Sequence, residues 1–336
     1  MLSLLIAFLI NAHATQPETI WDTHAKKFIS LDDLSAQKGD IFVLGEEHAV
    51  AGSETDPETT LHHANQLRMI QRLQRQTSVS VGMEFLTYTL QDFVARFVNG
   101  ALPEADFLKA VSWGSNPFQF YRDQILSTRG TAGETVALNI PADIASQVAK
   151  GGKDSLSNAQ RALLPPFWER GNAAYFERFS EMMKEHAPPD AIERYFWAQS
   201  LWDDTMSWRA LEHQARLPND VLVIIVGEFH VRFGGGLPTE LKNHGAASVK
   251  TVLQVAVPDM NEATVDDAIQ PDAKYGEIAD YIWIHQSPTA LSGGQNALVT
   301  AFRHAPSSSR EQAGCRVLRL ELSEILLGAF EKPCGK

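Results

Sequence analysis

The chain has 336 residues, of which 44% are hydrophobic, so it contains enough apolar material to build one large globular core. Its formal net charge of -12 argues against a nucleic-acid or anionic-lipid surface, because both ligands need a net cationic face. The two cysteines, Cys315 and Cys334, are too few for a cysteine-rich metal site, and they either pair in an oxidising compartment or stay free thiols.

The N-terminus has the pattern of an export signal. Residues 2–10 form an apolar run, and Asn11-Ala12-His13-Ala14 follows it with the small-x-small spacing that signal peptidase cleaves. The run is too short for a bilayer, which needs about 20 apolar residues. We therefore predict a signal peptide over residues 1–14 and an exported protein of the periplasm or cell envelope. The alternative is a buried first strand or helix.

Runs of β-branched and aromatic residues predict the strands of a sheet. The first strand is expected at 40–44 and the second at 78–83, with an amphipathic helix over 59–76 between them. Strand, helix and strand at this spacing form a βαβ unit, in which the two strands are parallel. Further strands are expected at residues 135–140, 221–226, 251–257 and 316–322.

Two long segments, 86–130 and 153–217, carry helical patterns and no convincing strand. Within them we expect helices at residues 91–97, 104–111, 158–164, 174–184 and 192–214. The whole pattern predicts a single α/β domain over residues 15–336. Its mostly parallel β-sheet is flanked by helices, and the two helical segments form a lid or subdomain over the sheet edge.

Polar residues follow four of the predicted strands, at the edge where ligands of parallel α/β sheets bind. Two strands lead into Gly-Glu-x-His sequences at 45–48 and 227–230, and the others end at Glu84 and Asn139. Glycine at these points lets the backbone turn sharply and approach a ligand closely. We expect a shared cluster of His48, Glu84 and His230, with Glu46, Glu47 and Glu228 nearby.

Each of these residues also has a purely structural explanation. A histidine after a strand often caps a helix or packs in the core, and a glutamate at a βα turn often caps the next helix. The joint pattern nevertheless favours a site, because several acids at one buried edge repel one another unless a cation or a proton balances them.

A series of short motifs links these strand ends to a known family. In chain order they are Gly45-Glu46-Glu47-His48, His62-His63-Ala64-Asn65-Gln66, Glu84, Asn139-Ile140-Pro141, Ala198-Gln199-Ser200-Leu201-Trp202-Asp203-Asp204-Thr205-Met206, Gly227-Glu228-Phe229-His230-Val231-Arg232, Gly236-Leu237-Pro238 and Ala279-Asp280-Tyr281-Ile282-Trp283. Over residues 30–290 the chain resembles the ChaN-like proteins of haem uptake and the Tiki superfamily.

The resemblance implies an exported, often lipid-anchored protein that binds haem in bacterial iron acquisition. It also implies a homodimer around the haem and envelope transport components as partners. No cysteine follows the predicted signal peptide, so a lipid anchor is not expected here. The implied pocket consists of Glu46, Glu47, His48, His62, His63, Gln66, Glu84, Asn139, Trp202, Asp203, His230 and Arg232.

Haem needs an apolar slot, an axial ligand and cationic partners for its propionates. The candidates for the axial ligand are Tyr88, Tyr121, Tyr195, His62 and His63, and the sequence does not choose among them. Aromatic walls are offered by Phe118, Phe120, Tyr121, Phe196, Trp197, Trp202 and Trp208. Arginines for a propionate are Arg122, Arg194, Arg209 and Arg232.

The same resemblance extends to erythromycin-esterase-like and Tiki-type metal-dependent hydrolases, and this implies an alternative function. In that case the catalytic residues are His48, Glu84 and His230, with His48 or Glu84 as general base toward water. A divalent metal would lie among Glu46, Glu47, His48, Glu84 and His230. Haem binding is our leading expectation, and metal-dependent hydrolysis is the alternative.

Overall fold

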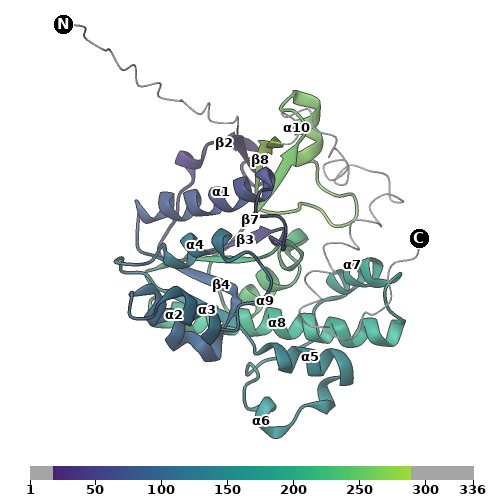
Figure 1. The fold of residues 1–336 in the computed structure, drawn as a ribbon. Coiled ribbons are helices and arrows are strands. Elements are labelled where there is room, and N and C mark those ends of the chain that lie inside the picture. The colour runs from purple at the N-terminus through teal and green to yellow at the C-terminus, as the bar shows by residue number, and fades with distance from the viewer. Residues whose placement is uncertain (1–17, 289–336) are drawn as a thin grey trace, which may run out of the picture.

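A computed structural model describes residues 18–288 and shows one eight-stranded sheet with helices on both faces (Figure 1). The strands are β1 (Glu18–Asp22), β2 (Lys27–Ile29), β3 (Ile41–Glu46), β4 (Val79–Thr87), β5 (Thr135–Asn139), β6 (Val221–Gly227), β7 (Val249–Val257) and β8 (Tyr281–Gln286). Their spatial order is β2-β1-β8-β7-β3-β6-β4-β5. The strands from β8 to β5 run parallel, and β1 and β2 add an antiparallel edge. The predicted fold class is confirmed.

Helices fill the connections between the parallel strands. They are α1 (Pro57–Gln74), α2 (Gln91–Val98), α3 (Glu104–Ala110), α4 (Arg122–Leu126), α5 (Ala142–Gly151), α6 (Asn158–Arg161), α7 (Ala173–Met183), α8 (Pro189–Arg216), α9 (Leu237–Asn243) and α10 (Glu262–Ile269). The first, α1, begins where Asp56 accepts the backbone N–H of Thr59, with Pro57 in the first turn.

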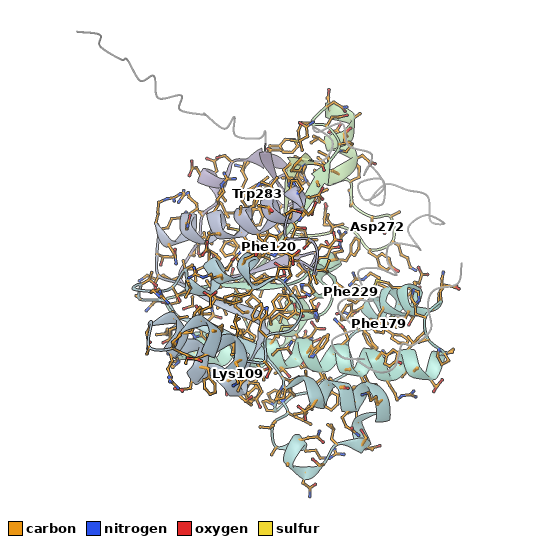
Figure 2. All side chains as sticks on the ribbon, viewed as in Figure 1. Lys109, Phe120, Phe179, Phe229, Asp272 and Trp283 are labelled. Atoms are coloured by element: carbon orange, nitrogen blue, oxygen red, sulfur yellow. The ribbon has the colours of Figure 1, made fainter. Side chains whose placement is uncertain are left out.

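The central strand β6 shows how the two layers of helices divide the core. Val221, Val223 and Ile225 point into the apolar cluster that contains residues of α1 to α4. Leu222, Ile224 and Val226 point into the cluster on the other face, which contains residues of α5, α7, α8 and α9. Both faces are therefore covered, as the uninterrupted apolar run of this strand predicts. Figure 2 shows the side chains of Phe120 and Phe179, one from each cluster.

The two edge strands β1 and β2 were not expected from the sequence. They have only five and three residues, and runs this short give a weak strand pattern. The strand β8 begins in the Ala-Asp-Tyr segment of the family resemblance and continues to Gln286. The predicted signal peptide, the strand expected at 316–322 and both cysteines lie outside the described residues.

The two segments expected to be helical contain no strand apart from the end of β4, which extends to Thr87 and so into the first of them. Residues 88–130 and 153–217 hold helices and 3-10 turns, and α8 also packs along β5, which makes it part of the layer that covers the sheet. None of the described helices has an apolar stretch long enough to cross a membrane.

Asp40 joins the amino ends of two neighbouring strands. Its buried carboxylate accepts a hydrogen bond of 2.8 Å from the backbone N–H of Gln37 and one of 2.6 Å from Nζ of Lys250 on β7. Burial raises the pKa of this carboxyl, but the bonds to Gln37 and Lys250 outweigh burial, and the pKa lies below its ordinary value.

We expect Asp40→Asn to lower the free energy of unfolding by about 1–3 kcal/mol at pH 7. A pKa lowered by folding means that the carboxylate stabilises the protein above its unfolded pKa of roughly 4, and that this contribution is lost as the pH falls through the folded value. The deficit measured by urea unfolding should therefore shrink at pH 3. The exposed Asp266→Asn is the matched control, with an expected change within about 0.5 kcal/mol. A deficit that is equal at both pH values would contradict this role.

Candidate functional site

The carboxyl ends of β3, β6 and β4 lie side by side and bring the predicted residues together. His48 follows β3, Glu84 lies in β4, and His230 lies in the turn after β6. Nε2 of His48 is 3.6 Å from Oε2 of Glu84, and Nε2 of His230 is 3.4 Å from Oε1 of the same carboxylate. The expected convergence of these three residues is present, with Glu84 between the two imidazoles.

Each of the two histidines contacts a second carboxylate through its other ring nitrogen. Nδ1 of His48 is 3.2 Å from Oε1 of Glu46, and Nδ1 of His230 is 2.6 Å from Oδ1 of Asp203, which α8 supplies. We call these five residues the strand-end cluster: Glu46, His48, Glu84, Asp203 and His230. Their side chains are between 0% and 8% exposed, so the cluster lies almost entirely inside the protein.

Glu46 is held by three further groups. The hydroxyl of Tyr121 donates a 2.8 Å hydrogen bond to Oε1, and Nε2 of Gln66 donates one of 2.6 Å to Oε2. Nε2 of His63 lies 3.5 Å from Oε2, while Nδ1 of His63 lies 2.8 Å from the backbone oxygen of Thr59. The His-His-x-x-Gln motif thus contributes its second histidine and its glutamine to the cluster's surroundings.

Asp203 is held by residues of the helical layer. The hydroxyl of Tyr175 donates a 3.1 Å hydrogen bond to Oδ2 of Asp203 and accepts one of 3.0 Å from Nε2 of Gln199. Nε2 of Gln199 also lies 3.1 Å from Nε2 of His230, and the ring of Trp202 is centred 6.1 Å from the His230 ring. Tyr175 was not predicted, because nothing in the sequence of α7 distinguishes it from an ordinary core residue.

The charges in this buried region compensate one another. Burial raises the pKa of Glu46, but His63 and His48 hold it well below its ordinary value, and His230 and His48 do the same for Glu84. Burial lowers the pKa of His230, but Asp203 and Glu84 raise it well above the ordinary value. His230 therefore lies between two carboxylates that favour its protonated form.

Tyr121 is a neutral donor in this region. Burial raises the pKa of its phenol, and the neighbouring Glu46 carboxylate raises it further. Its hydroxyl also accepts the backbone N–H of Ala49 at 3.1 Å.

The glycine of the first Gly-Glu-x-His sequence has a role different from the expected sharp turn. Neither Gly45 nor Gly227 has a positive φ. A Cβ on Gly45 would lie 2.4 Å from Cδ2 of Leu253 and 3.0 Å from Cα of Glu228. This glycine therefore lets β3 approach its neighbours closely, while the N–H of Gly227 donates a 2.6 Å hydrogen bond to Oε2 of Glu84.

Several residues of the predicted pocket lie outside the cluster. Glu47 is exposed, because it follows the inward Glu46 in an extended segment, and Arg232 pairs with Glu228 at 2.9 Å. Oδ1 of Asn139 accepts the N–H of Ile140 at 2.9 Å, at the end of the edge strand β5. His62 is turned away from His63 on α1, and its Nε2 lies 3.1 Å from Nε2 of His285.

The predicted metal-binding set does not gather tightly around one point. Among residues 18–288, one group of at least three His, Cys, Asp or Glu side chains has all its ligand atoms within 4.8 Å of one another, and it consists of Asp204, Glu240 and His244. The set of Glu46, Glu47, His48, Glu84 and His230 is instead spread along the strand ends. A surface hollow of about 560 Å³ lies at the opposite end of the sheet, near Gly39 and Lys250.

The structure distinguishes the five candidates for an axial haem ligand. Tyr88 donates its hydroxyl to the backbone oxygen of Leu163 at 2.8 Å, and Tyr121 donates to Glu46. His62 and His63 are buried in the contacts described above. Tyr195 is half-buried, and within the described part of the chain its hydroxyl has no hydrogen-bond partner.

Comparisons with known proteins agree with this architecture. The family model described as haem-binding uptake, Tiki superfamily, ChaN matches residues 34–241. The structure of ChaN of Campylobacter jejuni with cofacial haem is 15% identical, with 80% of this chain and 97% of that chain covered and a TM-score of 0.58. An erythromycin esterase EreC mutant in its open conformation is 12% identical, with 74% and 76% covered and a TM-score of 0.38.

No curated protein sequence matches the chain significantly. The similarity to ChaN of Campylobacter jejuni shows a shared fold. The family model covers more than half of the chain, and the motifs from which the family resemblance was inferred lie largely within the matched residues. The chain therefore belongs to the ChaN family of haem-binding uptake proteins in the Tiki superfamily.

Proposed function

We propose that this chain is an exported haem-binding protein of bacterial iron uptake, and that Tyr195 is the axial ligand of the haem. Membership of the haem-binding uptake family supports the ligand class. The observation that carries the residue assignment is the position of Tyr195: it is the candidate that combines partial exposure with a hydroxyl not bound by another described residue.

The surroundings of Tyr195 suit this role. Arg194 is the next residue on α8 and has a 35% exposed side chain, with Nη1 2.9 Å from Oδ2 of Asp190. Burial raises the pKa of the Tyr195 phenol, and the positive charge of Arg194 opposes that rise. The net effect is a raised pKa, so the iron itself would have to displace the phenol proton, and Arg194 supplies a positive charge on the same helix.

The helical layer offers the apolar surface that a porphyrin requires. Phe167 is 64% exposed, which is unusual for a large apolar side chain in a described region with few others. Leu163, Leu164 and Trp168 near it in sequence are partly buried and pack against the core, and the ring of Phe167 itself is centred 5.7 Å from the ring of His244. An exposed apolar surface of this kind fits haem enclosed between two copies of the chain, which is the dimer we propose.

The strand-end cluster has a supporting role in this proposal. Tyr195 lies four residues before Gln199 on α8, so both side chains project from the same helix face. Gln199 contacts Tyr175 and His230, and Asp203 pairs with His230 one turn further along. These buried contacts hold α8 against the sheet, and the position of Tyr195 on this helix follows from them.

We expect Tyr195→Phe to abolish the Soret band that appears when the haem-free chain is titrated with hemin, because the substitution removes the iron ligand and keeps the ring. Tyr88→Phe is the matched control, since it removes another half-buried phenol whose hydroxyl is bound to Leu163. It should leave the band in place. Circular dichroism would confirm that both variants fold.

A Soret band of unchanged position and affinity in Tyr195→Phe would overturn the ligand assignment. Failure of the unmodified chain to bind hemin at all would overturn the proposed function itself.

One observation favours a second candidate function, metal-dependent hydrolysis. His48 and His230 each bind a carboxylate through Nδ1 and turn Nε2 toward Glu84. Proteins commonly present histidine to a metal in this way, with a carboxylate orienting the ring from the other nitrogen. A divalent metal bound there would supply Lewis-acid chemistry. In that case His48 and His230 would be ligands, and Glu84 would take a proton from water.

If the chain hydrolyses esters with this cluster, Glu84→Gln should lower metal-dependent hydrolysis of p-nitrophenyl acetate by at least about 100-fold, because the amide cannot accept the proton. Hemin binding through Tyr195 should persist in the same variant. Glu212→Gln on the surface of α8 is the control. Hydrolysis that survives in Glu84→Gln, or is absent from the unmodified chain with Zn²⁺ or Mn²⁺ added, would remove this candidate.

A further inference from the structure

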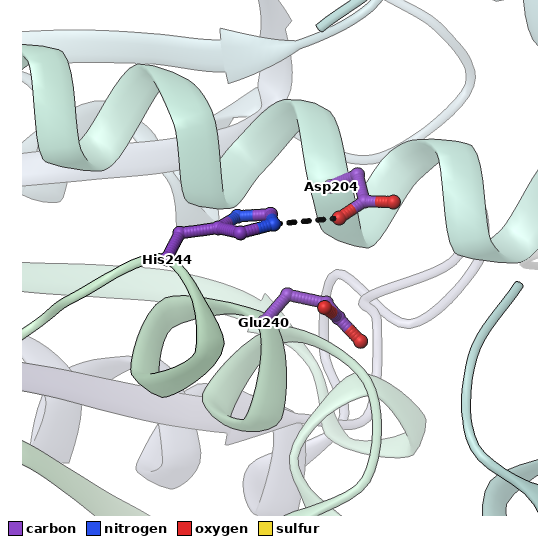
Figure 3. A group of neighbouring side chains, drawn as sticks. All are labelled: Asp204, Glu240 and His244. Atoms are coloured by element: carbon purple, nitrogen blue, oxygen red, sulfur yellow. Dashed lines mark ion pairs between the residues drawn. The ribbon is translucent and has the colours of Figure 1, made fainter. Parts of the chain in front are cut away.

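A second group of ionisable side chains lies between α8 and α9, apart from the strand-end cluster. It comprises Asp204 on α8, Glu240 on α9 and His244 directly after α9 (Figure 3). Their ligand atoms all lie within 4.8 Å of one another, and Nε2 of His244 is 3.7 Å from Oδ1 of Asp204. Two ligands that each bind a tetrahedral zinc ion at about 2.1 Å are about 3.4 Å apart, so this spacing suits a shared ion.

Each of the three side chains is held by a further hydrogen bond. Oδ2 of Asp204 accepts the backbone N–H of Glu169 at 2.9 Å, which leaves Oδ1 toward His244. Nδ1 of His244 lies 3.2 Å from Oγ of Ser207, and Oε2 of Glu240 accepts a bond of 3.2 Å from Asn243. Metal ligands are typically oriented in this way by outer groups.

The charge around this group calls for a cation. Asp204 is 2% exposed, and the other carboxylates that act on it are those of Glu240, Asp203 and Glu169. Across the described residues no lysine or arginine forms an ion pair with Asp204 or Glu240. His230 already compensates Asp203. A buried carboxylate among other acids is destabilising unless a proton or a cation balances it, and a bound divalent ion would supply the largest positive charge.

We propose that Asp204, Glu240 and His244 bind a divalent transition metal, with Zn²⁺ as the representative ion. The imidazole favours Zn²⁺ over Mg²⁺ and Ca²⁺, which prefer sites made of oxygen ligands alone. Three protein ligands leave a fourth position for water, and His244 is 20% exposed, which gives the ion a path from solvent.

A metal bound at this site would connect α9 with α8, the helix that carries Asp203 of the strand-end cluster. Asp204 adjoins Asp203 on α8, and α9 begins directly after Gly236. A Cβ on Gly236 would lie 2.8 Å from Oδ1 of Asp203, so the loop that leads into α9 already touches this carboxylate. A metal that joins α8 to α9 therefore holds this loop against Asp203. This inference does not depend on haem binding.

The test is calorimetric titration of the full chain, stripped of metal and free of haem, with Zn²⁺ alone. His244→Ala and Glu240→Gln change partly exposed side chains, and each should weaken binding by at least about 100-fold, because each removes a ligand. Ser207→Ala removes the group beside Nδ1 of His244 and should cost about 10-fold. The Co²⁺-loaded chain should show visible d–d bands that His244→Ala loses.

Two controls separate this site from other histidine and acid groups. His24→Ala removes an exposed histidine that pairs with Asp280, and Glu212→Gln alters an exposed acid on the same helix α8. Both should bind Zn²⁺ like the unmodified chain. Equal affinity in His244→Ala and the unmodified chain would overturn the proposal, as would a loss of binding in His24→Ala or Glu212→Gln that matches the loss in His244→Ala.

Discussion

The carboxylate of Glu84 is the group on which the arrangement of the strand ends depends. It is almost buried, it accepts the N–H of Gly227, and it lies between the imidazoles of His48 and His230. A buried carboxylate without such partners costs several kcal/mol, so the fold is stable only when all three segments are in place. The pairing therefore fixes the ends of β3, β4 and β6 relative to one another, and the positions of the more distant residues follow from it.

The helix α8 extends this constraint from the sheet to the surface. Asp203 and Asp204 are adjacent, but successive residues of a helix point about 100° apart, so one carboxylate meets His230 and the other faces His244. The first contact ties α8 to the strand ends, and the second lies at the contact of α8 with α9. Tyr195 is on the same rigid helix, two turns before Asp203. The ion pair of Asp203 with His230 thus helps to position α8, and the position of Tyr195 follows from that of the helix.

How much of this could be predicted from the sequence differs from residue to residue. The convergence of His48, Glu84 and His230 was predictable, because parallel strands place their carboxyl ends at one edge and each residue directly follows or ends an apolar run. Glu46 and His63 point into the cluster, whereas their neighbours Glu47 and His62 point away from it. A sequence motif does not show which of two adjacent side chains points inward. The partner of His62 is His285, more than two hundred residues later, and Tyr175 comes from a helix with an ordinary core pattern. Such contacts arise only from tertiary packing.

The burial of the strand-end cluster also bears on which ligands can reach it. Its side chains are at most 8% exposed, so a ligand as large as haem cannot reach them without a rearrangement, whereas water or a metal ion can be accommodated among a few polar atoms. A flat porphyrin needs an accessible ligand and an apolar surface beside it. The half-buried phenol of Tyr195 is more accessible than the side chains of the cluster. The strand-end cluster can therefore either support the helix that carries Tyr195 or bind a small ligand itself. In this chain Asp203 and Glu84 both contact His230 and favour its protonated form, whereas a metal ligand must be deprotonated, which favours the role of scaffold.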